Sequence, residues 1–173
     1  MTPVELLVQR GAEEIVHPGG TLLGHLQRVA ERLASYGSSS DLVTAGLMHA
    51  AYSTDGFDTS LLTMEERPAL RAVVGDEAEA LVYRYGATSR VPFYRQLGQP
   101  LVVWVDRFTL ASVTLDPEDV APLVELTVAN ELDVVEQAPS LPDGFVDSLR
   151  GLFDRAALLM SAAAADDVRR TLG

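Results

Sequence analysis

The sequence predicts an all-α protein folded as one domain of six to eight helices. Alanine and leucine dominate the composition, and runs of β-branched residues are short, which favours helix over strand. The clearest amphipathic repeat puts apolar side chains on one helical face, at Leu22, Leu26, Val29 and Leu33. Because 173 residues is the size of one domain with its own core, we expect a single helical domain over 1–173.

Boundary residues predict the helices of the N-terminal half. The ranges expected to be helical there are 3–10, 21–36, 41–52, 64–73 and 76–86. Thr2 and Pro3 suit the start of the first helix, and Gly37 suits the end of the second. Thr63 and Glu66 match a capping box before the fourth. The third range is apolar almost all round, so we expect that helix to be central and buried.

The C-terminal half has less regular patterns. Residues 87–100 show no clear period and are expected to form a long irregular segment. Residues 101–114 begin with the β-branched run LVVWV, but we predict a buried helix there, because no second strand is evident nearby to pair with its backbone. An Asp-Pro-Glu-Asp start precedes a helix over 118–136, and two prolines separate it from a last helix over about 143–165. Residues 166–173 are expected to fray.

The composition excludes several classes of function. Without cysteine there is no disulfide framework, cysteine-ligated metal or thiol nucleophile. Lys plus Arg number 13 against 25 Asp plus Glu, and this net charge of −12 repels a polyanion, so we expect no nucleic-acid partner. The longest apolar runs are too short to cross a membrane, and the first residues lack a signal-peptide pattern. We therefore expect a cytoplasmic protein with no membrane partner.

Two of the three histidines and one aspartate stand in apolar surroundings. His25 lies within the apolar stripe of its helix, His49 lies near the end of the most apolar helix, and Asp106 directly follows LVVWV. A buried carboxylate needs a cation, a metal or hydrogen-bond donors. Two imidazoles and a carboxylate would suit a single divalent metal such as Mn, Fe or Zn. Alternatively, each histidine is a core residue with a hydrogen bond, and Asp106 caps a helix or pairs with an arginine.

Four segments in the same order resemble motifs of the HD-domain superfamily of metal-dependent phosphohydrolases. They are HLQRVA at 25–30, AGLMHA at 45–50, GDEAEALV at 75–82 and VVWVDR at 102–107. The likeness is greatest to the hydrolase domain of the stringent-response guanosine tetraphosphate enzymes. It covers about 15–115 and leaves the helices of 116–165 outside. The resemblance implies a helical HD-like fold, with His25, His49 and Asp106 as metal ligands.

The sequence departs from that family at the dyad for which it is named. Ala50 stands where the family has a metal-binding aspartate, and the Glu-Asp pair that follows the dyad is also missing. The segment is more similar to a little-characterised group of bacterial HD-like proteins. These share an H-x-x-Y-x-T signature, here His49 to Thr54, and a preceding H-x-G segment, here His17 to Gly19. This second likeness implies no established activity.

The altered site leaves three interpretations open. In the first, His25, His49 and Asp106 hold one metal, with His17 as a replacement ligand, and a metal-bound water attacks a phosphorylated or related small substrate. In the second, there is no cofactor, and an acid–base cluster catalyses isomerisation, cyclisation, dehydration or hydrolysis. The candidate catalytic residues of that cluster are His17, His25, His49, Tyr52 and Asp55. In the third, the pocket binds a ligand without chemistry.

Other residues are candidates for binding a small-molecule substrate. Arginines could bind its phosphate or carboxylate, aromatic rings could form a pocket wall, and Asn130 with Glu131 could make specific hydrogen bonds. The candidates are Arg28, Arg84, Arg95, Arg107, Trp104 and Asn130. Surface arginines that balance the acidic chain are the alternative. The apolar C-terminal helix could serve either the core or a homodimer.

Overall fold

The computed structural model describes residues 1–173 as a mainly helical molecule with two small antiparallel sheets. Its helices are α1 Pro3–Gln9, α2 Leu22–Ser35, α3 Ser40–Met48, α4 Arg67–Val74, α5 Asp76–Gly86, α6 Arg90–Gln96, α7 Pro117–Gln137, α8 Phe145–Arg155 and α9 Ala162–Leu172. The strands are β1 Val16–His17, β2 Gly20–Thr21, β3 Val102–Val105 and β4 Ser112–Leu115, and the short 3-10 helices are η1 Met64–Glu66 and η2 Ala157–Leu159. The mainly helical character is confirmed, whereas the expectation of an all-α chain missed both sheets.

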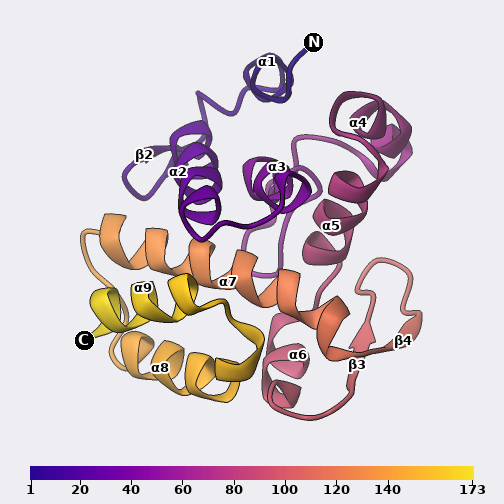
Figure 1. Ribbon diagram of the computed structural model, residues 1–173. Coiled ribbons are helices and arrows are strands. Elements are labelled where there is room, and N and C mark those ends of the chain that lie inside the picture. The colour runs from indigo at the N-terminus through magenta and orange to yellow at the C-terminus, as the bar shows by residue number, and fades with distance from the viewer.

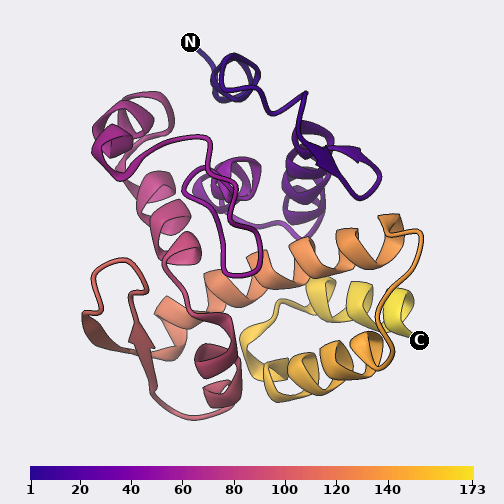
Figure 2. The same ribbon diagram turned by 180° about the vertical axis from the view of Figure 1, so that it is seen from behind.

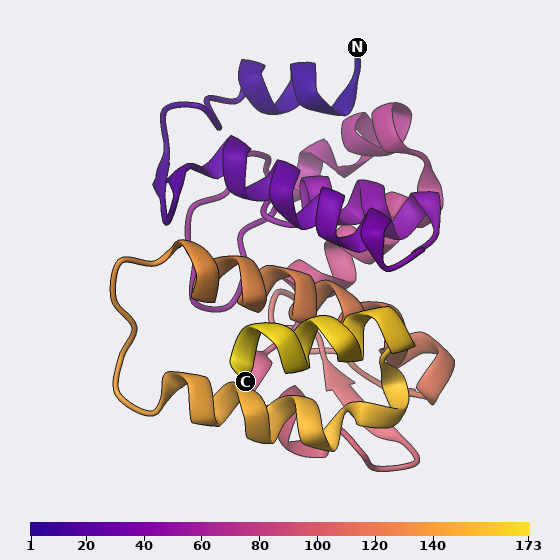
Figure 3. The ribbon, with the colours of Figure 1, turned by 60° about the vertical axis from the view of Figure 1, so that its left-hand side comes forward.

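The long helix α7 crosses the middle of the molecule and divides it into two parts (Figure 1). Helices α1 to α5 lie on one side of α7, α6, α8 and α9 lie on the other, and the β3–β4 hairpin lies beside one end of α7. A side view shows α1, α2, α7 and α8 as successive layers (Figure 3). Eleven residues of α7 are buried, because this helix is covered from both sides.

Apart from the end of α3, the predicted boundaries of the N-terminal helices agree closely with the structure. Thr2 caps α1 and forms a capping box with Glu5, and Thr63 forms the expected box with Glu66 at the start of η1. Gly37 follows α2 with a φ of 77°, a left-handed conformation that glycine adopts without steric cost. These boundaries depend on local hydrogen bonds, which is why the sequence predicts them.

Helix α3 ends at Met48, four residues before the predicted end at position 52. His49 is its C-cap, and the chain then turns away through Ser53, whose φ is 64°. His49 and Tyr52 therefore do not share a helical face as expected. Seen from behind, the loop that follows α3 reaches down to α7 (Figure 2). This early end brings loop residues, in place of another helical turn, next to the central helix.

Two predictions for residues 87–114 were wrong. The segment expected to be irregular contains α6, and the segment expected to be a helix is the β3–β4 hairpin. The run VVWV does pair with a strand, and its partner SVTL begins only seven residues after it. The predicted helix over 101–114 includes most of that partner, so the β-propensity of the run is the better indicator.

The C-terminal segment is also more structured than expected. The predicted last helix is divided into α8, η2 and α9, and the supposedly frayed residues 166–173 lie almost wholly in α9. Ser161 caps α9 by accepting a hydrogen bond from the backbone of Ala164. Within α9, Asp167 accepts hydrogen bonds from Tyr36 and Arg32, which fix the end of the chain against α2.

Buried apolar residues form two clusters, and Leu81, Tyr83 and Phe108 pack against both of them. The larger cluster of 24 residues packs α7, α8, α9 and the hairpin, and the smaller cluster of 15 packs α1, α2 and α3 with the loop after it. No helix of the chain is both long and apolar enough to pass through a lipid bilayer. The polar residues described next lie where α7 faces α2 and the loop after α3.

Candidate functional site

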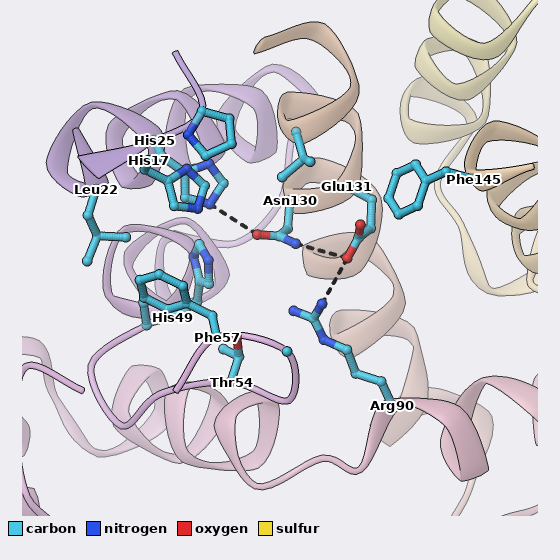
Figure 4. A pocket seen from close by; sticks show the side chains of 14 residues that line it. His17, Leu22, His25, His49, Thr54, Phe57, Arg90, Asn130, Glu131 and Phe145 are labelled. Carbon is cyan, nitrogen blue, oxygen red and sulfur yellow. Dashed lines mark hydrogen bonds and ion pairs between the residues drawn. The ribbon is translucent and has the colours of Figure 1, made fainter. Parts of the chain in front are cut away.

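A cavity of about 260 Å³ lies where α2, α3 and the loop after it meet α7 (Figure 4). Its polar lining consists of His17, His25, His49, Thr54, Arg90, Asn130 and Glu131. Apolar side chains, Leu22, Phe57, Val134 and Phe145 among them, complete the wall. The cavity thus collects all three histidines of the chain, from three separate elements.

His17 reaches the cavity through a tight turn at the start of the domain. Gly19 and Gly20 have φ values of 80° and 129°, which only glycine adopts freely, and they reverse the chain between β1 and β2. The turn lays the His17 ring flat on the ring of His25, with ring centroids 4.0 Å apart. The two glycines of the sequence His-Pro-Gly-Gly thus permit the turn that places the His17 ring on the His25 ring.

His25 is held by acceptors at both ring nitrogens. Its Nδ1 lies 2.6 Å from the Asp133 carboxylate, and its Nε2 lies 3.1 Å from Asn130 Oδ1. The Asn130 amide nitrogen faces the Glu131 carboxylate, which can only accept, so the amide oxygen faces His25. Both ring nitrogens of His25 therefore face hydrogen-bond acceptors.

Asp133 is buried against two cationic partners. His25 and Arg28 both donate to its carboxylate, with Arg28 in two-pronged contact at 2.6 and 3.0 Å. Burial raises the pKa of Asp133, but hydrogen bonds from His25 and Arg28 outweigh burial and hold the pKa below its usual value. The ionised carboxylate fixes the orientation of the His25 ring.

His49 has the opposite hydrogen-bonding pattern. Its Nδ1 lies 2.7 Å from the carbonyl oxygen of Gly46, which can only accept, so Nδ1 carries the proton. The other nitrogen, Nε2, has a lone pair and no protein partner. Burial, together with the neighbouring His25, lowers the pKa of His49 to about 3. The ring is thus neutral at pH 7 and can accept a proton.

His17 is also neutral at pH 7. Burial lowers its pKa to about 4, and the nearby His25 adds to this effect. Its Nδ1 is buried and has no hydrogen-bond partner in the protein. An unpartnered buried nitrogen at a cavity wall is unfavourable unless a ligand or water supplies the missing bond.

The far wall of the cavity is a chain of polar contacts along α7. Asn130 donates to Glu131, and Glu131 is paired with Arg90 from the start of α6 at 3.2 Å. Figure 4 shows this line running from His25 through Asn130 and Glu131 to Arg90. Asn130 was expected to bind substrate, and the structure places it at the cavity. Asp133 was missed, although the polar group Asn130, Glu131 and Asp133 in an apolar helix could have indicated it.

The expected metal site of His25, His49 and Asp106 is not formed. The rings of His25 and His49 lie 5.2 Å apart, but Asp106 does not line the cavity. Its carboxylate instead accepts from the Tyr83 hydroxyl and two backbone amides of the β3–β4 turn. No group of three or more histidine, aspartate or glutamate side chains is arranged to hold a metal ion. The residues present thus do not fit the single divalent metal that the family resemblance implies.

Tyr52 and Asp55, expected in the acid–base cluster, point elsewhere. The Tyr52 hydroxyl donates to Glu79 at 3.0 Å, within a buried group that also pairs Glu79 with Arg67 and Arg71. Asp55 accepts from the backbone nitrogen of Arg90 and so caps α6. Tyr52 and Asp55 thus make hydrogen bonds that stabilise the fold away from the cavity. Of the five residues expected in the acid–base cluster, only the three histidines line the cavity.

The arginines and the tryptophan expected to bind substrate lie at different places in the structure and do not form one group. Arg28 supports Asp133 behind His25, and Arg95 lines a neighbouring groove. Arg84 forms an exposed pair with Asp119.

Arg107 and Trp104 lie away from the cavity. Arg107 donates to Gly86 and Ser53, and the Trp104 indole donates to Thr88. These two side chains hold the hairpin to α5 and the loop after α3.

A family model described as a domain of unknown function (DUF6817) matches residues 6–90. The matched range runs from α1 to the start of α6 and contains His17, His25 and His49. No curated protein and no solved structure matches the chain. The three histidines thus belong to the part of the chain that is similar to this family, whereas the residues of α7 that complete the cavity lie outside the match.

Proposed function

We propose that the chain is a small-molecule enzyme that transfers protons without a bound metal. The arrangement of His49 beside His25 carries the proposal. His49 has a free Nε2 lone pair, and the neighbouring His25 has acceptors at both nitrogens. A neutral imidazole is a proton acceptor, and a fixed imidazolium stabilises negative charge that develops on a substrate. The reacting group of the substrate would lie between the two rings.

Charge at the cavity favours an anionic substrate. With a proton on each ring nitrogen of His25, as the proposal requires, Arg28, His25 and Arg90 would contribute three positive charges against two negative ones from Asp133 and Glu131, a balance of 3 − 2 = +1. This positive site lies in a chain with a net charge of −12. A bound anion would also raise the pKa of His49 towards neutrality, because a nearby negative charge favours the protonated ring. The substrate itself would make His49 a stronger base.

The reactions open to this site are hydrolysis, isomerisation, cyclisation and dehydration of a phosphate- or carboxylate-bearing small molecule. The resemblance to the HD-domain superfamily supports hydrolysis of a phosphorylated compound. The alanine at position 50 and the remote position of Asp106 support a route without metal. His17, stacked on His25, is the second proton acceptor of the site.

The tautomer of His49 tests the proposed base directly. Long-range proton–nitrogen NMR spectra of the wild-type protein at pH 7 should show His49 protonated at Nδ1 and free at Nε2. Protonation at Nε2 would contradict the proposal, because no lone pair would then face the cavity.

Activity can be tested before the substrate is known. The wild-type protein, in the presence of EDTA, should deplete an anionic compound from a mixture of cell metabolites followed by mass spectrometry. His49→Gln should lower that rate by about 100-fold or more, the usual contribution of a general base. Arg84→Gln, which alters an exposed ion pair far from the cavity, is the control. Full activity of His49→Gln, or loss of activity with EDTA, would overturn the proposal.

A further inference from the structure

A second hollow, a groove of about 600 Å³, lies beside the histidine cavity between α6 and α8. Arg90, Glu131 and Phe145 line both hollows. Figure 4 shows these three side chains at the edge of the cavity opposite the histidines. The groove therefore begins where the cavity ends, and its volume is in the range of about 300–1,000 Å³ found for small-molecule sites.

The helix sequences explain why this groove is apolar along its floor. Phe145, Ser148, Leu149, Leu152 and Arg155 line it and recur at the spacing of one face of α8. Leu149 and Leu152 form a buried apolar strip in the middle of that face, and Arg155 ends it.

Across the groove, α6 presents Val91, Tyr94 and Arg95. Val91 is 58% exposed, and the Tyr94 hydroxyl is buried without a hydrogen-bond partner. The groove thus joins an apolar floor to one unpartnered polar atom and to an arginine on each helix.

Two arginines of this groove differ from all the others. All 13 basic side chains of the chain are arginines. Ten of them form ion pairs with carboxylates. Arg107 is hydrogen-bonded to Gly86 and Ser53. The remaining two, Arg95 and Arg155, form no hydrogen bond or ion pair through their side chains, and both line this groove.

Unpaired arginines in so acidic a chain are unexpected, because 25 carboxylates are available to pair with 13 arginines. The two carboxylates of the groove already have partners. Asp55 accepts from the backbone of Arg90, and Glu131 is bonded to Arg90 and Asn130. Arg95 and Arg155 are therefore free to bind a carboxylate or phosphate from outside the protein.

We infer that the groove binds an amphipathic anion, whose apolar body lies on Leu149 and Leu152 and whose terminal carboxylate or phosphate is held by Arg95 and Arg155. The opposite end of the molecule points past Arg90 into the histidine cavity. This inference rests on the proposed function in one respect only, namely the reaction of the ligand end that enters the histidine cavity. It names the substrate class as an elongated molecule with an anionic group remote from the reacting atoms.

Isothermal titration calorimetry with simple probes tests the inference. Octanoate and octyl phosphate supply both the apolar body and the charge, octanol lacks the charge, and acetate and inorganic phosphate lack the body. At least one of the two amphipathic anions should bind ten times or more tightly than octanol and than its own short counterpart. The better of the two identifies the head group. Binding no tighter than that of octanol, acetate and phosphate would overturn the inference.

Variants locate the bound anion. Arg95→Gln with Arg155→Gln should weaken binding of the better probe about tenfold or more, whereas Arg84→Gln with Arg169→Gln removes the same charge from outside the groove and should not. Val91→Asp changes an exposed side chain of the groove and should also weaken binding without disturbing the core. Equal affinity in the two double variants would overturn the inference.

The proposed function and the groove inference can be tested independently of each other. His49→Gln should retain octanoate or octyl phosphate binding within about threefold, because His49 does not line the groove. If the groove variants lose binding but His49 is protonated at Nε2, the groove stands and the catalytic proposal fails. If His49 has the expected tautomer but the probes do not bind, the groove inference fails alone.

Discussion

His49 combines burial with a neutral ring at the wall of a polar cavity, and both follow from its position at the end of α3. The helix leaves the Gly46 carbonyl without a helical partner, and the Nδ1 proton of His49 satisfies it. No charge compensates the ring, so burial favours the neutral form and lowers the pKa to about 3. The same contact that completes the helix end therefore leaves the Nε2 lone pair of His49 without a protein partner.

This lowered pKa predicts a pH-dependent stability. The unfolded chain protonates His49 near the ordinary histidine pKa of 6.5, whereas burial lowers the pKa to about 3 in the folded chain. The contribution of the neutral His49 ring to the free energy of unfolding is therefore fully present above about pH 6.5. Below that pH the free energy of unfolding falls by about 1.4 kcal/mol per pH unit because of this one ring. Urea unfolding at pH 7, 6, 5 and 4 should show a shallower loss for His49→Gln than for the wild type. Parallel curves would contradict the prediction.

Glu79 is the second residue with a testable energetic role. It is fully buried, and three donors, Tyr52, Arg67 and Arg71, satisfy its carboxylate. Burial raises the pKa of Glu79, but hydrogen bonds from these donors outweigh burial and lower the pKa overall.

Glu79→Ala should destabilise the protein by about 3 kcal/mol, because it leaves the buried Tyr52 hydroxyl and the part-buried Arg67 without their partner. Glu77→Ala, at an exposed position of the same helix, should change the free energy of unfolding by less than about 0.5 kcal/mol. Urea denaturation measures both, and similar values for the two variants would contradict the assigned role.

At the scale of elements, glycine decides how closely α2 and α3 pack. A Cβ atom added at Gly46 would lie 2.4 Å from a side-chain carbon of Leu33. The missing side chain thus lets the two helices that carry His25 and His49 approach each other. The sequence predicts both helices but not this contact, because it depends on the register of two separate segments.

Gly46→Ala should destabilise the protein by about 1–3 kcal/mol, the usual effect of overpacking a core, despite the higher helix propensity of alanine. Gly151 is a matched control, since a Cβ atom there meets only the end of the Arg155 side chain at 3.7 Å. Gly151→Ala should stabilise α8 by about 0.5–1 kcal/mol. Thermal unfolding should therefore shift in opposite directions, and a shift in the same direction would contradict this explanation.

The β3–β4 hairpin shows why some elements were mispredicted. Its first strand has the composition of a strand, but pairing with SVTL is set by the turn that Asp106 closes. Propensity predicts the conformation of a segment, whereas its partner is a tertiary property. The same turn explains the buried carboxylate: Asp106 is satisfied by a hydroxyl and backbone amides and needs no metal.

At the scale of the whole molecule, polar contacts over long distances in sequence connect its two ends. Asp167 in α9 accepts from Tyr36 and Arg32, which lie more than 130 positions earlier. This group fixes the C-terminal helix against α2, next to Asp133 and Glu136 of α7.

Asp167→Ala should destabilise the protein by about 3 kcal/mol, because a buried tyrosine hydroxyl and Arg32 lose their common partner. Asp166→Ala, at the exposed neighbouring position, should change the free energy of unfolding by less than about 0.5 kcal/mol. Chemical denaturation of the two variants provides the comparison, and equal losses would show that α9 is not fixed through Asp167.

The sequence by itself determined the mainly helical character, most helix starts and the buried positions of His25 and His49. Helix caps, apolar periodicity and turn glycines depend only on residues close together in the sequence. They can therefore be recognised without knowledge of the tertiary structure. Only the tertiary structure decided which polar groups share the cavity. It brought Asn130, Glu131 and Asp133 to His25, and it took Asp106 and Tyr52 to other partners. The physical reason is that burial makes each polar group take the nearest compatible partner, and which partner is nearest depends on how distant segments pack.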